Sequence, residues 1–425
     1  GGDHSGDYGS RSVGIIASTH DDFYFGTYDD AGNMLTNPAA FMETDGAKKF
    51  LNFNEDGFSG IAEGGKYYTR DFDGKTAYRV IYRPNMIHPL VAFSTTCVGY
   101  AVDFFDTTLG APKPLPASDQ IWPIKAVFNS LGVIGLLIFM VSFTLVLLDT
   151  PVFSALRSGE IVQPAPVQDN GAKAWYWVLL IIGAVFSGAS FLFCMNTVYS
   201  KTTNFFVQTG PLTIGTWAAL CGVFAIFCSA VFYGAYGKKH GWSARRAGLY
   251  LNLEQLWKTI ALAVIVIVVS FGLVFAAHYF FQVDYRMYVV AFKTFGADKV
   301  LIALRYLPFF LLFYVMNSIS ANCFNYNTIG GKNGNILIFA FFNALGAIFV
   351  VASQYIYFYA TGYQLYGLTE GQRIGPIWLF PCMVLLFVTP IMSRIIYKRT
   401  RNPYIAGLIN AMFIVMISCS NTTTI

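Results

Sequence analysis

The stretch that decides the fold reads IKAVFNSLGVIGLLIFMVSFTLVLL and runs from residue 124 to residue 148. Its only charged side chain is Lys125, near the start of the run. A helix needs about 20 consecutive apolar residues to cross the ~30 Å hydrocarbon core of a bilayer. This stretch therefore predicts a transmembrane helix.

Seven further apolar runs follow it, so we predict an α-helical polytopic membrane protein with about eight transmembrane helices. The composition agrees, because 55% of the residues are hydrophobic and only 12% are charged, against about a quarter charged in soluble domains. The last run is the shortest and also fits a re-entrant or interfacial segment. The predicted spans are residues 124–148, 174–199, 212–236, 258–282, 299–324, 335–360, 375–397 and 403–420.

Lysine and arginine in the loops predict the orientation, because cytoplasmic loops carry the excess of these residues. One side holds twelve of them and the other five. We therefore expect the N-terminal segment outside the cytoplasm, in a multi-pass protein of the cell membrane. The larger set is Arg157, Lys173, Lys238, Lys239, Arg245, Arg246, Lys258, Lys332, Arg394, Lys398, Arg399 and Arg401, and the smaller is Lys201, Arg286, Lys293, Lys299 and Arg373.

Polar residues inside the predicted spans have two interpretations. Polar groups at membrane depth are costly and often functional, but they also form hydrogen bonds between helices or snorkel towards the interface near a span end. The run NSISANCFNYN (317–327) could line a water-filled cavity or form the frayed end of its span. The loop 238–258 fits an interfacial helix or a plain connector. The polar residues in question are His278, Arg305, Asn317, Asn322 and Asn343.

The cysteines predict neither a disulfide framework nor a metal site. Six of the seven lie in or beside apolar runs, which is typical of cysteine packed as a small apolar residue. No C-x-x-C or H-E-x-x-H spacing occurs. The pattern of charge suggests no nucleic-acid-binding surface, and the bilayer itself is the expected partner of the apolar runs.

We predict a separate domain over residues 1–115, ahead of a transmembrane domain over residues 116–425. VGIIAS (13–18) is typical of a buried parallel strand. KYYTRDFDGKTAYRVIYRP (66–84) predicts a β-hairpin that turns at Asp73-Gly74. The stretch after Pro89 predicts an amphipathic helix that packs on the sheet through Val98, Val102 and Phe105.

Two residues of this domain follow strands: Asp21 comes after the first strand and His88 after the hairpin. In this order they resemble the C-terminal part of an α/β-hydrolase, as found in serine esterases and prolyl-oligopeptidase-like enzymes. In that family the acid follows an apolar strand and the His comes later in the chain. The resemblance covers about residues 10–110 and implies a partial α/β fold with Asp21 and His88 as catalytic acid and base. We expect their side chains within about 2.6 to 3.2 Å of each other.

The chain departs from the family pattern at three places. Ser18 stands where the strand motif has Gly, and no G-x-S-x-G elbow is present. His4-Ser5-Gly6 does not fit, because Ser5 lies too close to Asp21 for the intervening helix and strand. The chain begins with Gly1 instead of Met, so we expect a fragment or processed chain whose nucleophile and oxyanion hole lie upstream. The stretch from residue 24 to residue 65 would be an insertion near the site entrance.

The predicted function is that of a membrane-anchored serine hydrolase with an extracytoplasmic catalytic domain, acting on an ester, amide or peptide. Triad chemistry needs no cofactor, and the substrate would be a small molecule, a lipid or a peptide. One alternative is a membrane transporter or channel with a degenerate hydrolase-like cap. Another is a hydrolase whose helical bundle admits a lipid substrate laterally.

Overall fold

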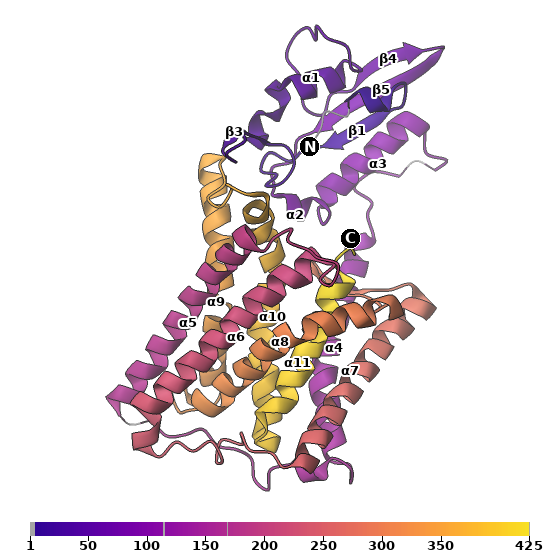
Figure 1. Cartoon of the computed structure of the whole chain (residues 1–425). Helices are drawn as coiled ribbons and strands as arrows, with labels where there is room; N and C mark the ends of the chain where they lie inside the picture. Colours follow the sequence, from indigo (N-terminus) through magenta and orange to yellow (C-terminus); the bar gives the residue numbers. More distant parts are fainter. Residues whose placement is uncertain (1–4, 114, 168, 425) are drawn as a thin grey trace. The chain divides into compact units, whose positions relative to one another are not determined.

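The computed structural model describes residues 5–113, 115–167 and 169–424, and it divides into two compact units (Figure 1). The N-terminal unit comprises Gly1–Lys125 together with Ala352–Ile377. The helical unit comprises Ala126–Val351 and Trp378–Ile425. Residues 352–377, which we predicted to belong to the transmembrane domain, thus cluster with the N-terminal unit.

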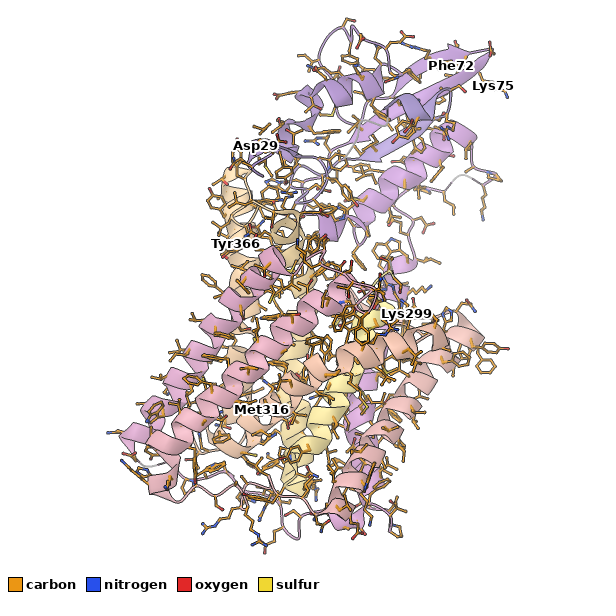
Figure 2. All side chains as sticks on the ribbon, in the orientation of Figure 1. Asp29, Phe72, Lys75, Lys299, Met316 and Tyr366 are labelled. Atoms are coloured by element: carbon orange, nitrogen blue, oxygen red, sulfur yellow. The ribbon has the colours of Figure 1, made fainter. Side chains whose placement is uncertain are left out.

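A three-stranded sheet in the order β1-β5-β4 lies at the centre of the N-terminal unit. Strands β1 (Val13–Ile16) and β5 (Lys75–Tyr82) are parallel, as predicted. Strands β4 (Tyr68–Phe72) and β5 form the predicted antiparallel hairpin. Its turn residues Asp73 and Gly74 have φ of 46° and 77°, and positive values at both positions are what a two-residue hairpin loop requires. Figure 2 labels the residues on either side of this turn, Phe72 and Lys75.

Helices α1 (Asp45–Leu51) and α3 (Thr95–Leu109) cover opposite faces of this sheet (Figure 1). Neighbouring residues of a strand point to opposite faces. Accordingly, Ile81 packs with Phe50 and Leu51 of α1, whereas the ring of Tyr82 stacks on Tyr100 of α3 at 4.5 Å. The N-terminal unit is therefore a small three-layer α/β/α arrangement.

The stretch from residue 24 to residue 65 is more than the insertion that we expected. It contains a two-stranded sheet of β2 (Thr27–Tyr28) and β3 (Met34–Thr36). It also supplies a 3-10 helix (Pro38–Glu43) and α1. Because α1 provides one of the two layers that bury the sheet, this stretch is part of the core.

The predicted helix after Pro89 is present as α3, but we predicted the wrong face. Val102 and Phe105 are 40% and 58% exposed. The buried face instead carries Cys97 and Phe104. The ring of Phe104 lies only 3.0 Å from where a Cβ on Gly14 of β1 would be. Apolar residues lie on more than one side of α3, so its periodicity does not show which side is buried. The space above Gly14 decides which phenylalanine ring packs against the sheet.

Among the described residues, eight helices are long and apolar enough to cross a membrane. Each overlaps one predicted span, so the prediction of a multi-pass helical membrane fold is confirmed. The shortest, with 18 residues, is also the most buried. The helices are α4 (Trp122–Leu148), α5 (Asn170–Thr197), α6 (Thr209–Ala235), α7 (Leu253–Phe281), α8 (Val300–Ile319), α9 (Gly331–Thr361), α10 (Glu370–Thr400) and α11 (Pro403–Ser420).

Two connections of the helical unit have defined structure. Between α7 and α8 lies a small hairpin of β6 (Tyr285–Met287) and β7 (Val290–Phe292). The loop before α7 consists of a 3-10 turn (Gly237–His240) followed by turns, so the interfacial-helix interpretation of residues 238–258 is wrong. Gly241 and Gly248 interrupt any helix there with φ of 72° and 78°. The loop is a connector, and its Trp242 Nε1 donates a hydrogen bond of 2.8 Å to the carbonyl of Cys323.

Candidate catalytic site

Two loops meet at one edge of the β1-β5-β4 sheet. One follows β1 and the other follows β5, and parallel neighbouring strands end at the same edge. The pairing continues beyond the strands, because the amide of Thr19 donates to the carbonyl of Pro84 at 2.9 Å. His20 and Ile87 then form an isolated parallel bridge. The next residues of the two loops are Asp21 and His88, the predicted catalytic acid and base.

The structure brings the side chains of Asp21 and His88 together across 67 residues of sequence. Asp21 Oδ2 lies 2.9 Å from His88 Nδ1, within the predicted range. The other oxygen, Oδ1, accepts hydrogen bonds from the amides of Phe23 and Tyr24 at 3.0 and 2.8 Å. Because a carboxylate can only accept, Nδ1 carries the proton in this pair, and in the neutral ring Nε2 keeps its lone pair.

The hydrogen bond from Asp21 raises the pKa of the His88 imidazole above its usual value, and the negative charge of Asp21 adds to the effect. Partial burial acts in the opposite direction, because it disfavours the charged ring. An acid that raises the pKa of a neighbouring imidazole makes it a stronger proton acceptor. The pair is thus suited to general-base chemistry.

The His88 ring is partly exposed. The side chain is 36% exposed, while that of Asp21 is only 2% exposed. The rings of Tyr24 and Phe23 lie beside it, with centroids at 5.0 and 6.3 Å. Among the residues that the structure describes, none forms a hydrogen bond with Nε2. A substrate or a nucleophile could therefore reach this nitrogen.

No nucleophile is evident beside Nε2 in the described part of the chain. Ser18, the serine of the acid loop, is fully buried, and its hydroxyl donates to the carbonyls of Pro84, at 3.2 Å, and Met86. Its position is structural, because it ties the two loops together. His4 and the side chain of Ser5 lie outside the described residues.

Asp22, the next residue after Asp21, is a second buried acid at the same edge, and the sequence analysis did not single it out. Its Oδ1 accepts the backbone amide of His88 at 3.1 Å. Its Oδ2 accepts the hydroxyl of Tyr355 at 2.7 Å. Burial raises the pKa of Asp22 to about 6. The Asp-Asp doublet is visible in the sequence, but the neighbouring residues do not predict its contact with Tyr355, 333 residues away.

Two further histidines pack against aromatic rings. The half-buried ring of His20 stacks on Tyr359 with centroids 4.5 Å apart and meets Phe358 edge-on at 5.5 Å. The ring of His240 stacks on Tyr236 at 3.8 Å, and this residue is exposed. Neither ring contacts a carboxylate in the described structure, so the Asp-His geometry is confined to His88 among these three.

A second polar site lies inside the helical unit, around Arg394 of α10. We predicted Arg394 to be a loop charge, but its side chain is only 2% exposed. Its Nε donates to Asn322 Oδ1 at 2.8 Å and its Nη1 to Asn335 Oδ1 at 2.9 Å. Its Nη2 donates to the carbonyl of Ala321, and the guanidinium lies 3.9 Å from the centroid of the Tyr326 ring.

Three other polar residues of the spans, Asn317, Asn343 and Arg305, also form hydrogen bonds between segments. Asn317 Nδ2 donates to Asn343 Oδ1, and Asn343 Nδ2 donates to the carbonyl of Leu386, both at 2.6 Å. Arg305 donates to the carbonyl of Phe205 at 3.0 Å. His278 lies near the end of α7, where its Nδ1 is 3.7 Å from Asp284. The contacts of Asn317 and Asn343 fit the interpretation as interhelical hydrogen bonding.

Part of the polar run 317–327 lines a pocket, and the water-filled cavity of one interpretation stays a prediction. Residues 320–324 continue α8 as a π-helical segment, so the end of this span is ordered helix and not frayed. The pocket has a volume of about 120 Å³ and lies among α5, α6, α8 and α9. Asn317, Asn325 and Asn343 are among the residues that contribute polar groups to its mostly apolar wall.

Metal ligands do not gather at either polar site. In the described residues no group of three or more His, Cys, Asp or Glu side chains could hold a metal ion. All seven cysteines are free thiols.

The fold defines the class of this protein as an integral multi-pass membrane protein. We compared the chain with models of protein families, with curated proteins and with solved structures, and none of the three comparisons finds a match. The function must therefore be argued from the geometry of the two polar sites.

Proposed function

We propose that this chain carries the acid and the base of a membrane-anchored serine hydrolase. The observation that supports the proposal is the Asp21–His88 hydrogen bond of 2.9 Å, combined with a His88 ring that is partly exposed. In such a pair Nε2 takes the proton of the attacking serine, while the carboxylate holds the tautomer and stabilises the imidazolium. The substrate class is an ester, an amide or a peptide.

The serine and the oxyanion hole belong, in this proposal, to sequence that precedes Gly1. The parallel pair β1-β5, with an acid after one strand and a His after the other, supports this order of triad residues. A G-x-S-x-G elbow between a strand and a helix upstream would supply the nucleophile.

The test uses the full-length gene product in its membrane and a fluorophosphonate probe, which labels activated serines. We expect labelling of the longer chain and none of residues 1–425 alone. In the longer chain His88→Ala should lower ester hydrolysis about a thousandfold or more, because the serine loses its base. His240→Ala, which removes an exposed His of the helical unit, is the matched control.

Two outcomes would contradict this proposal. Full hydrolysis by the His88→Ala protein would end the hydrolase assignment. Labelling of the present chain at Ser5 would show that the nucleophile is not upstream.

We also propose that the N-terminal unit lies on the extracytoplasmic side of the cell membrane. With Arg394 removed from the loop charges, eleven basic residues remain on the predicted cytoplasmic side against five on the other. On a background without native cysteines, Asp56→Cys should react with an impermeant thiol reagent on intact cells, and Lys239→Cys should not. Asp56 is suitable because its side chain is 87% exposed. The reverse labelling pattern would overturn the orientation.

Gly32 is a poor position for such a probe, although it lies in an exposed turn. Its φ is +85°, and a Cβ there would lie 1.8 Å from the carbonyl oxygen of Leu368. Any side chain at this position would therefore displace the neighbouring backbone.

The pocket lined by Asn317 and Asn343 favours a second candidate function, a transporter or channel whose hydrolase-like unit is degenerate. Polar groups that line a cavity between membrane helices are typical of transport pathways. Purified protein in planar bilayers should then show a conductance above that of the protein-free bilayer, and Asn317→Leu should abolish it. Absence of any conductance or flux, with hydrolase activity present, would exclude this candidate.

A further inference from the structure

A chain of hydrogen bonds connects helix α9 with the backbone of His88. Tyr355 of α9 donates its hydroxyl to Asp22 Oδ2 at 2.7 Å, and the amide of His88 donates to Asp22 Oδ1 at 3.1 Å. Asp22 is fully buried, and Tyr355 is buried as well. The carboxylate of Asp22 therefore accepts from two donors, the His88 amide and the Tyr355 hydroxyl, which are far apart in the sequence.

The same face of α9 makes further contacts with the acid loop. Tyr355, Phe358 and Tyr359 are spaced three and four residues apart, which places them on one side of a helix. The rings of Phe358 and Tyr359 contact His20. Just beyond the helix, Gln364 Nε2 donates to the backbone carbonyl of Asp22. The end of α9 is thus part of the wall that holds the acid loop.

His88 is in this way fixed at two points by two neighbouring acids. Asp21 holds the ring at Nδ1, and Asp22 holds the backbone amide. His88 begins the short helix α2 (His88–Val91), whose N-cap residue Ile87 offers no side-chain hydrogen bond. Asp22 supplies the missing acceptor from another loop, so the direction in which the His88 side chain leaves the backbone depends on where Asp22 lies.

A buried carboxylate is costly unless donors satisfy it. Among the described residues no Lys or Arg forms an ion pair with Asp22, and its side-chain oxygens depend on the amide of His88 and the hydroxyl of Tyr355. Loss of the Tyr355 hydroxyl would leave Oδ2 without its donor in a buried place. The carboxylate would then shift or rotate towards water, and the amide of His88 would lose its acceptor.

We propose that Asp22 is a positioning residue for His88, and that Tyr355 of the membrane helix α9 holds Asp22 in the orientation this requires. The proposal rests on the hydrolase function for its consequence in catalysis, but the positioning itself is a property of this chain. It makes the end of a membrane helix a part of the candidate active site, in addition to the hydrolase-like segment.

The test is Tyr355→Phe in the full chain in detergent micelles, since this change removes only the hydroxyl. Amide hydrogen exchange of His88 should become about fivefold faster or more, because the amide loses its acceptor. The titration of the His88 imidazole, followed by NMR with isotope-labelled histidine, should shift as well. Tyr357→Phe, on the exposed side of the same helix, should change neither.

A conservative rescue separates positioning from a merely structural role. Asp22→Asn keeps an oxygen that accepts the His88 amide, and its NH₂ group can donate to Tyr355. His88 exchange should therefore stay close to that of the unchanged protein in Asp22→Asn and accelerate in Asp22→Ala. Unchanged exchange and titration in folded Tyr355→Phe protein would overturn the proposal.

The failure of the hydrolase function would look different. In the full-length gene product, Tyr355→Phe should lower kcat about tenfold and leave KM unchanged, because a misplaced base slows the chemical step. If the full-length protein has no hydrolase activity while His88 exchange still responds to Tyr355→Phe, the hydrolase function is wrong and the positioning stands. If kcat falls while exchange and titration stay unchanged, the positioning is wrong and the hydrolase function stands.

Discussion

The N-terminal unit and the helical unit each bury a charged group, but they satisfy it in different ways. Asp21 and Asp22 have exposed fractions of 2% and 0%, and Arg394 has 2%. Arg394 is held by neutral partners: two asparagine side chains, one backbone carbonyl and one aromatic ring. Asp21 is held by two amides and by a titratable ring that is partly exposed. Burial of charge therefore does not by itself indicate a reactive site.

The chemistry of the partners explains this difference. A guanidinium keeps its charge at all ordinary pH values and has only donors, so acceptors from two helical segments can tie it in place. An imidazole can gain or lose a proton near neutral pH. The Arg394 site thus serves to hold α8, α9 and α10 together, whereas the Asp21–His88 site can move a proton.

Asp21→Asn should have the largest effect on function. The amide can donate to Nδ1, so the His88 ring would be held in the wrong tautomer, and hydrolysis by the full-length gene product should fall about ten-thousandfold. The pKa of His88 should fall as well, because the hydrogen bond and the charge that raise it are removed. Both quantities are measurable, by initial rates and by NMR titration of labelled histidine. An unchanged His88 pKa would show that Asp21 does not raise it, and the contrast with the Arg394 site would then fail.

The same substitution has a consequence for stability that depends on pH. A raised pKa in the folded state means that the Asp21–His88 pair stabilises the fold fully below the unfolded pKa of histidine, about 6.5. That contribution is lost as the pH rises through the folded pKa. The free energy of unfolding of Asp21→Asn should therefore approach that of the unchanged protein at high pH and lie below it at low pH.

Arg394→Ala should cost about 3 kcal/mol or more in stability and leave the Asp21–His88 pair unaffected. The change leaves Asn322, Asn335 and the carbonyl of Ala321 without their donor in a buried place, at about 1 to 3 kcal/mol for each group. The midpoint of thermal unfolding in detergent measures the loss. Arg399→Ala, which removes an exposed arginine of the same helix, should change it little. Equal midpoints for both variants would show that the buried network does not hold the bundle.

Asp22→Asn should raise stability at neutral pH by about 2 to 3 kcal/mol, because it removes a carboxylate that is costly to ionise when buried. Its pKa is raised from 3.8 to about 6. The stability that protonated Asp22 contributes is fully present below pH 3.8 and is lost as the pH rises through about 6. Unfolding midpoints at pH 5 and pH 8 should therefore differ more in the unchanged protein than in Asp22→Asn. An equal pH dependence would contradict the raised pKa.

The smallest expected effect concerns the packing of α3. Phe104→Ala should lower the free energy of unfolding by about 1 to 2 kcal/mol, because the ring fills the space above Gly14. Phe105→Ala removes an identical side chain that is 58% exposed and should cost only a few tenths of that. Chemical unfolding of the two variants under the same conditions decides between the faces. A larger loss for Phe105→Ala would restore the face that we predicted from the sequence.

The sequence by itself determined the features that depend on neighbouring residues. The eight spans follow from runs of apolar side chains, which are more stable in lipid than in water. The hairpin follows from Asp73-Gly74, whose backbone adopts positive φ. The resemblance to α/β-hydrolases, carried by the order of Asp21 and His88 after two strands, predicted that their side chains meet.

Only the tertiary structure decided which distant groups complete each site. Tyr355 and Asp22 are 333 residues apart, and Arg394 meets Asn322 across 72. The local sequence around Tyr355 is that of an ordinary membrane helix. The residues next to Arg394 in the sequence are those expected around an arginine at the end of a membrane helix. Such contacts have no local signature, because their free energy arises from burial and hydrogen bonding that exist only after the segments have packed.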